Sequence, residues 1–84
     1  MDRAEITRRL IPIVRKSLNR GPEESITPEM DLVTDLGADS MDIMETVLRL
    51  EKEFHFSAED VPKENFRSIE KLITLVEQHS DGQK

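Results

Sequence analysis

The sequence of 84 residues contains no cysteine and no long apolar run. Without cysteine, the chain forms neither a disulfide framework nor a cysteine-based metal site. No segment approaches the roughly 20 consecutive apolar residues that a transmembrane helix needs, so we expect no membrane span. The charged N-terminus also lacks the apolar stretch of a secretory signal. A small domain without disulfides suits a reducing compartment, and we therefore expect a cytoplasmic protein.

Basic residues are too few for a nucleic-acid-binding protein. The net charge is −6, whereas binding to nucleic acid needs a basic surface. The charge is also uneven, because residues 1–20 carry six basic side chains against two acids, and residues 31–56 carry seven acids against two basic side chains. The second segment is either a solvated helix face or a docking face for a basic partner.

Apolar residues recur at helical spacing, with no strand alternation of any length. At this length one thin core is expected. We predict a single all-α domain over residues 1–84, monomeric, with a flexible tail from about residue 80. Its predicted fold is a small four-helix bundle with a long first loop and a short third helix.

The N-terminal half is predicted to contain one helix and the long loop. Asp2 followed by Glu5 is typical of a helix N-terminus with a capping box. We expect a kink or a break at Pro12, because proline removes a backbone donor and crowds the preceding turn. The connection over residues 23–38 contains many apolar residues, which predicts that it packs onto the core.

The C-terminal half is predicted to contain three helices. The second helix of the chain is expected from Ser40 to Phe54, with an unusually wide apolar face. A short third helix is expected around residues 58–61, ended by Pro62. Ser68 is expected to cap the last helix.

Ser40 stands in the string DLGADSMD, residues 35–42, directly before the second helix. A hydrolytic serine needs a base within hydrogen-bond reach. His55 lies about four helical turns away, His79 lies near the end of the chain, and the G-x-S-x-G elbow is missing. Hydrolysis is therefore not expected. We expect Ser40 to cap the second helix in the unmodified chain, although Asp39 is also able to do so.

The density of aspartates does not predict a metal site. A calcium-binding EF-hand loop needs glycine at its sixth position. A loop starting at Asp31 places Leu36 there, and a loop starting at Asp35 places Ser40 there. We therefore expect no metal ligands in this segment.

The whole string DLGADSMD closely resembles the D-L-G-x-D-S-[LM]-D signature of the acyl carrier proteins. The segments ITPEMDLVTDLGADS (26–40), METVLRLEKEF (44–54) and FRSIEKLITLVEQ (66–78) are similar to the family's entry loop, second helix and closing helix. The resemblance implies that Ser40 carries 4′-phosphopantetheine through a phosphodiester. It further implies a carrier and not an enzyme. Its partners would be a phosphopantetheinyl transferase and the acyl-loading, condensing and acyl-transfer enzymes of fatty-acid or polyketide biosynthesis.

The resemblance also implies two groups of binding residues, carried over by position. The family docks on basic patches of its partners, and the matching positions here are Asp39, Met41, Asp42, Glu45 and Glu51. The family's acyl pocket lies between the second and last helices, and its positions here are Leu32, Thr46, Val47, Leu50, Ala58, Phe66, Leu72 and Leu75. Asp39 would also lie at the metal site of the transferase.

Three departures from the family pattern indicate a specialised carrier. Arg49 and Lys52 dilute the acidic face, and Ala58 stands where a larger apolar residue is common. Thr46 replaces the usual leucine, and its hydroxyl is expected to bond the Asp42 carbonyl. An amino-acid or peptidyl carrier remains an alternative, and so does a non-carrier module that docks through its acidic second helix. The string DLGADS favours acyl cargo.

Overall fold

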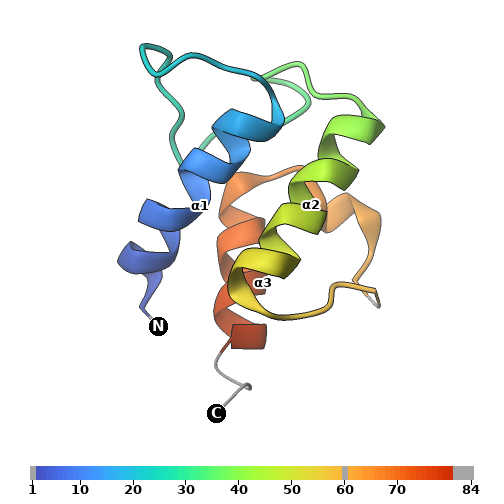
Figure 1. Ribbon diagram of the computed structural model, residues 1–84. Helices are drawn as coiled ribbons and strands as arrows, with labels where there is room; N and C mark the ends of the chain where they lie inside the picture. The colour runs from blue at the N-terminus through green and yellow to red at the C-terminus, as the bar shows by residue number, and fades with distance from the viewer. Residues whose placement is uncertain (1, 60, 81–84) are drawn as a thin grey trace.

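The computed structural model describes residues 2–59 and 61–80, and these residues form a helical fold (Figure 1). The elements are α1 (Arg3–Ser17), α2 (Ser40–Phe54), η1 (Lys63–Phe66) and α3 (Ile69–Ser80). The all-α prediction is confirmed, as are the bounds of the second helix. The described ranges hold three α-helices, however, and η1 is a short 3₁₀ helix, so the count of four helices is not confirmed. Residues 81–84 of the predicted tail lie outside the described residues.

The short third helix does not lie where it was predicted. Residues 56–59 are not helical, residue 60 is outside the described residues, and the 3₁₀ helix η1 begins only after Pro62. The backbone of Pro62 is extended, with φ −60° and ψ 141°, at the N-cap position of η1. Proline favours the start of a helical segment because its fixed φ and missing N–H cost nothing there. Pro62 therefore precedes the turn that it was expected to end.

Pro12 does not break α1, which runs without interruption from Arg3 to Ser17. Ile6, Leu10 and Val14 lie on both sides of the proline, and all three are fully buried. Burial of such side chains contributes roughly 1.5–3 kcal/mol each, which is comparable with the roughly 3 kcal/mol that an internal proline costs. Tertiary packing thus holds the helix together across Pro12.

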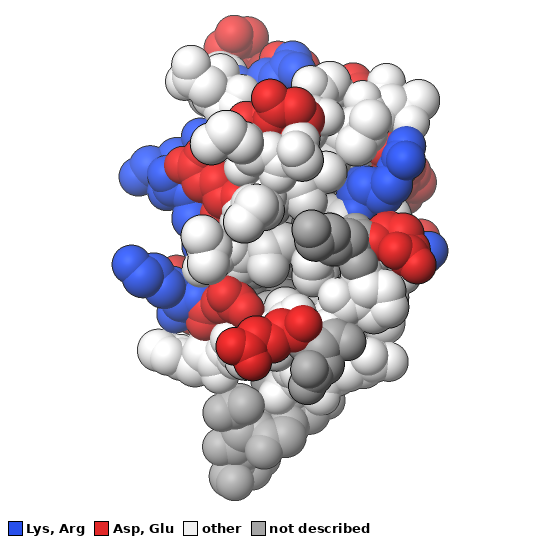
Figure 2. Space-filling model, turned by 90° about the vertical axis from the view of Figure 1, so that its right-hand side faces the viewer, with Lys and Arg blue, Asp and Glu red and all other residues white. Residues whose placement is uncertain are grey.

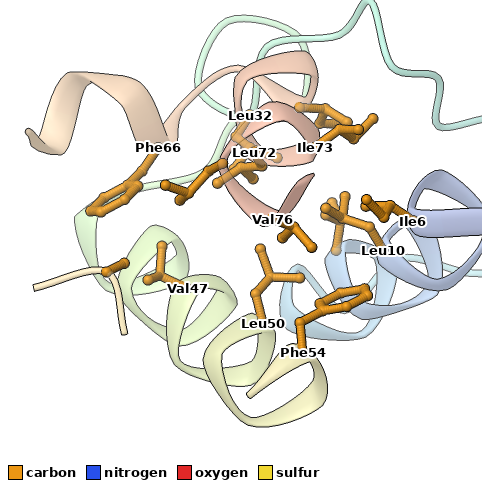
Figure 3. Close-up of a cluster of buried hydrophobic side chains, with 14 of the residues drawn as sticks. Ile6, Leu10, Leu32, Val47, Leu50, Phe54, Phe66, Leu72, Ile73 and Val76 are labelled. Carbon is orange, nitrogen blue, oxygen red and sulfur yellow. The ribbon is translucent and has the colours of Figure 1, made fainter. Parts of the chain in front are cut away.

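The three α-helices pack around one core. Figure 3 shows Leu10 of α1, Leu50 and Phe54 of α2, and Val76 of α3 directed into the same interior space. The apolar face predicted for α2 includes Val47, Leu50 and Phe54, and all three are buried. Ser40 begins α2 at the end of the molecule opposite to the start of α1 and the end of α3 (Figure 1). In the described part of the chain, no helix is long and apolar enough to cross a bilayer.

The long loop between α1 and α2 packs against the helices, as predicted. Ile26, Leu32 and Leu36 are buried in the core. The Leu32 N–H donates to the Arg67 carbonyl at 2.6 Å, and the Ile69 N–H donates to the carbonyl of residue 30 at 3.2 Å. The loop is therefore fastened to the chain just before α3.

Asp31 reinforces this attachment with its carboxylate. One oxygen accepts the backbone N–H groups of Val33 and Thr34, both at 2.8 Å, and the other accepts the Nε of Arg67 at 3.1 Å. The Thr34 N–H is the main cause that lowers the pKa of Asp31 from 3.8 to about 2. Burial acts in the opposite direction, while Arg67 and the Val33 N–H lower the pKa further. The folded protein thus favours the ionised carboxylate.

The attachment predicts a pH-dependent loss of stability in Asp31→Ala. The folded pKa lies below the unfolded one, so the stabilisation is complete above about pH 4 and is lost as the pH falls through about 2. At pH 7 we expect the variant to unfold with about 1–2 kcal/mol less free energy. Urea unfolding between pH 2 and pH 7 measures this difference. Glu29→Ala, an exposed acid of the same loop, is the control. An equal loss in both variants, or a loss that persists at pH 2, would contradict the assignment.

Candidate functional site

The start of α2 is fixed by two reciprocal hydrogen bonds. The Asp39 side chain accepts the Asp42 N–H at 2.9 Å, and the Asp42 side chain accepts the Asp39 N–H at 3.1 Å. Together they form a capping box, with Asp39 as the N-cap residue in extended conformation. Ser40 is consequently the first helical residue.

Ser40 is therefore not the cap of α2, as had been expected, because Asp39 occupies that position. A carboxylate is favoured at the positive end of a helix and makes stronger, charge-assisted hydrogen bonds than a hydroxyl. Ser40 itself is exposed, and its hydroxyl has no hydrogen-bond partner in the described ranges. The Ser40 side chain is thus accessible and is not held by a hydrogen bond within the described residues.

The backbone that leads to Ser40 makes a tight turn at Gly37. Its φ of +69° lies in the left-handed region, which glycine adopts without the steric cost of a side chain. The Ala38 N–H then donates to the Leu32 carbonyl at 2.8 Å. Arg20 donates to the Leu36 carbonyl and also pairs with Glu24 at 2.8 Å. The segment that follows α1 thereby holds the turn from the other side.

An apolar groove begins at Ser40 and follows α2. Its volume is about 550 Å³. One wall consists of α2 residues and the other of residues 56–59 with Phe66. The lining residues are Ser40, Ile43, Met44, Val47, Leu48, Glu51, Phe56, Ser57, Ala58, Glu59 and Phe66. Figure 2 looks onto the side that carries α2 and the segment after it, where uncharged side chains lie between acidic ones above and below them.

Three of the eight predicted acyl-pocket residues line this groove, namely Val47, Ala58 and Phe66. In Figure 3 the Phe66 ring lies across from Val47. The other five are buried and do not line the groove: Leu32, Thr46, Leu50, Leu72 and Leu75.

The hydroxyl of Thr46 donates to the Asp42 carbonyl at 2.8 Å, as expected. Its polar group is therefore satisfied although the residue is fully buried. Met44 and Leu48 were not predicted to line the groove, yet their spacing of four and eight residues from Ser40 places all three on one helix face. This helical spacing is the sequence signal from which their place in the groove could have been predicted.

Residues 8–76 match the family described as "Phosphopantetheine attachment site". The chain belongs to the acyl carrier protein family. It is a carrier of acyl groups on covalently bound 4′-phosphopantetheine and has no catalytic activity of its own.

Relatives of the carrier come from plants and bacteria. "Acyl carrier protein 2, mitochondrial" of Arabidopsis thaliana is 32% identical over 79 residues, which are 94% of this chain and 62% of that protein. The chain thus spans less than two thirds of the plant relative. "Acyl carrier protein" of Syntrophobacter fumaroxidans is 36% identical over 73 residues, covering 87% of this chain and 89% of the relative. A protein of the same name from Clostridium perfringens is 34% identical over 59 residues, covering 70% and 78%.

The predicted docking residues of the carrier lie along α2, and most of their charges have partners within the chain. Asp39 and Asp42 form the capping box. Glu45 pairs with Arg49 at 2.8 Å, and the Glu51 carboxylate accepts the N–H of residue 58 at 2.7 Å. A carboxylate has about four acceptor positions, so each retains capacity for a partner.

Met41 is the one apolar member of the predicted docking group, and its side chain is 77% exposed. Met44 and Leu48, which line the groove, are also exposed. Methionine adapts its shape to different surfaces, so this exposed row suits contact with more than one enzyme.

The cap assignment predicts different costs for two neighbouring substitutions. Asp39→Ala removes an acceptor at the start of α2, and we expect a loss of about 1 kcal/mol of unfolding free energy. Ser40→Ala should cost less than about 0.5 kcal/mol, because the hydroxyl makes no bond within the fold. Urea unfolding followed by circular dichroism measures both. If Ser40→Ala cost as much as Asp39→Ala, the serine would be the cap after all.

Proposed function

We propose that Ser40 is the residue to which the 4′-phosphopantetheine of this carrier is attached. The supporting observation is the Ser40 hydroxyl itself, which is exposed, has no partner in the described part of the chain and opens onto the apolar groove. The Asp42 N–H at the N-terminus of α2 is already bonded to Asp39, and the support for a phosphate comes from the helix dipole and the other first-turn N–H groups. The residues present therefore fit the group.

Attachment requires chemistry from a phosphopantetheinyl transferase. The Ser40 oxygen forms a bond to the phosphorus next to the pantetheine of coenzyme A, while the pyrophosphate bond breaks. Adenosine 3′,5′-bisphosphate leaves, and the hydroxyl proton passes to a base of the transferase. Ser40 needs no activating residue within this chain, which agrees with its lack of a hydrogen-bonded base. Asp39, directly before it, would lie at the metal site of the transferase.

The attached group supplies a flexible arm with a terminal thiol that holds acyl groups as thioesters. The groove beside Ser40 would accept an acyl chain, because most of its lining is aliphatic or aromatic. This lining favours acyl cargo over the polar side chains of an amino-acid carrier. The proposed pathway is fatty-acid or polyketide biosynthesis. We further propose that the chain is a single carrier domain and that it acts in the cytoplasm.

The docking face would consist of Asp39, Met41, Asp42, Glu45 and Glu51. Exposed ion pairs contribute less than about 1 kcal/mol each, so several must form together. Such contacts mainly increase the association rate and the specificity. That behaviour suits a carrier that visits a transferase, a loading enzyme and a condensing enzyme in turn.

Intact-mass spectrometry tests the attachment residue. The chain is incubated with coenzyme A, magnesium and a broad-specificity phosphopantetheinyl transferase. We expect the wild-type chain to gain the mass of one phosphopantetheinyl group and Ser40→Ala to gain nothing. Ser57→Ala, which removes another serine of the same groove, is the matched control and should be modified normally. A gain in Ser40→Ala, or no gain in the wild type, would refute the proposal.

Solution NMR tests the groove as the place of the acyl chain. Octanoyl-loaded protein is compared with protein that carries the unloaded arm. We expect chemical-shift changes at Val47, Ala58 and Phe66, which line the groove, and none at Leu10 and Val14 of α1. Changes confined to Ser40 and its neighbours would show that the chain stays in solvent.

A further inference from the structure

A second hollow lies between α1 and α2, away from Ser40. Its volume is about 390 Å³. Its lining residues are Pro12, Ile13, Lys16, Arg49, Lys52 and Glu53, and we call it the α1–α2 groove. Pro12 and Ile13 are apolar, whereas Lys16, Arg49 and Lys52 are cationic.

The positive charge of this groove is only partly neutralised within the chain. Lys16 and Lys52 make no ion pair in the described ranges. Glu53, the only acid in the lining, pairs instead with Arg9 at 2.7 Å.

Arg49 has one carboxylate partner, Glu45 at 2.8 Å, and its Nε has no acceptor in the part of the chain that the structure describes. The Nε is buried, so only the Nη groups are able to donate to a further carboxylate.

The α1–α2 groove is continuous with the surface beside the proposed attachment residue. A third hollow of about 590 Å³ is lined by Glu45, Leu48, Arg49, Glu51 and Lys52. It shares Arg49 and Lys52 with the α1–α2 groove, and Leu48 and Glu51 with the groove at Ser40. A partner protein bound to the acidic residues at the start of α2 would therefore lie close to Arg49 and Lys52. In Figure 2, basic side chains gather at the left edge of this side of the molecule, next to acidic ones.

Acids dominate the start of α2, whereas acids and cations are mixed at its end, where Glu51 and Glu53 flank Lys52. Glu51 accepts the N–H of residue 58, and Glu53 pairs with Arg9, so both acids already have partners within the chain. Asp42 and Lys52 are ten residues apart, which is about 15 Å along a helix. The Debye length at physiological ionic strength is about 8 Å, so salt screens the acids at the start of α2 from the α1–α2 groove.

We propose that the α1–α2 groove binds an acidic segment of a partner protein. Its apolar floor would take an aliphatic side chain, while Lys16, Arg49 and Lys52 pair with carboxylates around it. This site goes beyond the proposed function. It rests on the proposed function in one respect, which is that the partner protein is an enzyme that acts on the carrier. A partner with a basic patch for Asp42 and an acidic one for Lys52 would fit α2 in a single direction, so the two contacts together would fix its orientation.

An NMR titration tests the groove with a defined probe. The probe is a capped twelve-residue helical peptide of glutamate, alanine and leucine, added to the ¹⁵N-labelled chain. We expect shift changes at Ile13, Lys16, Arg49 and Lys52, and weaker binding as sodium chloride rises. Ser40→Ala should bind equally well, so failure of phosphopantetheine attachment and failure of this proposal are separate results.

A charge-reversal pair provides the control. Lys52→Glu should weaken peptide binding about tenfold, since an attraction is replaced by a repulsion. Lys71→Glu makes the same charge change on an exposed lysine of α3 and should leave the affinity unchanged. Lys52→Gln should weaken binding about threefold, and a thermal melt of each variant verifies folding.

Three results would overturn the proposal. The first is an absence of binding, or shift changes centred on Met41 and not on Lys52. The second is an equal loss of affinity in Lys52→Glu and Lys71→Glu, which would reflect net charge alone. The third is a dimer in sedimentation velocity that Lys52→Glu dissociates, because the groove would then hold a second copy of this chain.

Discussion

The reciprocal hydrogen bonds between Asp39 and Asp42 fix where α2 begins, and the helix that follows joins the core to the groove at Ser40. A helix that starts at Ser40 buries Val47, Leu50 and Phe54 against α1 and α3. The same register turns Met44 and Leu48 outward on the Ser40 side. A shift of one residue would rotate every side chain by about 100°. The capping box therefore couples the core to the surface that the proposed function uses.

The sequence was sufficient wherever one periodic pattern decided the outcome. Apolar spacing gave the bounds of α2, and the apolar residues of the long loop indicated that it packs down. Helix boundaries were predicted less well where one residue type is able to play two roles. Proline both starts and ends helices, so Pro62 was assigned the wrong role, and either Asp39 or Ser40 could cap α2.

Contacts distant in sequence left no local signal. Asp31 and Arg67 are 36 residues apart, and Arg20 lies 16 residues before Leu36. The residues next to Arg20 and Arg67 in the sequence are typical of a solvent-exposed segment, so they give no sign of these contacts. The second wall of the Ser40 groove comes from Ala58 and its neighbours, so its outline depends on how a non-helical segment crosses α2.

The fold pairs many of the charged side chains of α2 with groups within the chain. Each predicted acidic docking residue already has a partner within the chain, so binding would add to these contacts and not replace them. Arg49 takes part in both regions, because it pairs with Glu45 and also lines the α1–α2 groove. Arg49 thus lies where the acidic docking residues and the α1–α2 groove meet.

The loop before Ser40 is held at two places, by Arg20, which follows α1, and by the Asp31–Arg67 pair just before α3. Both contacts fix the position of the backbone that leads to the start of α2. Movement of cargo between the groove and a partner would then arise in the attached arm and not in a displacement of Ser40.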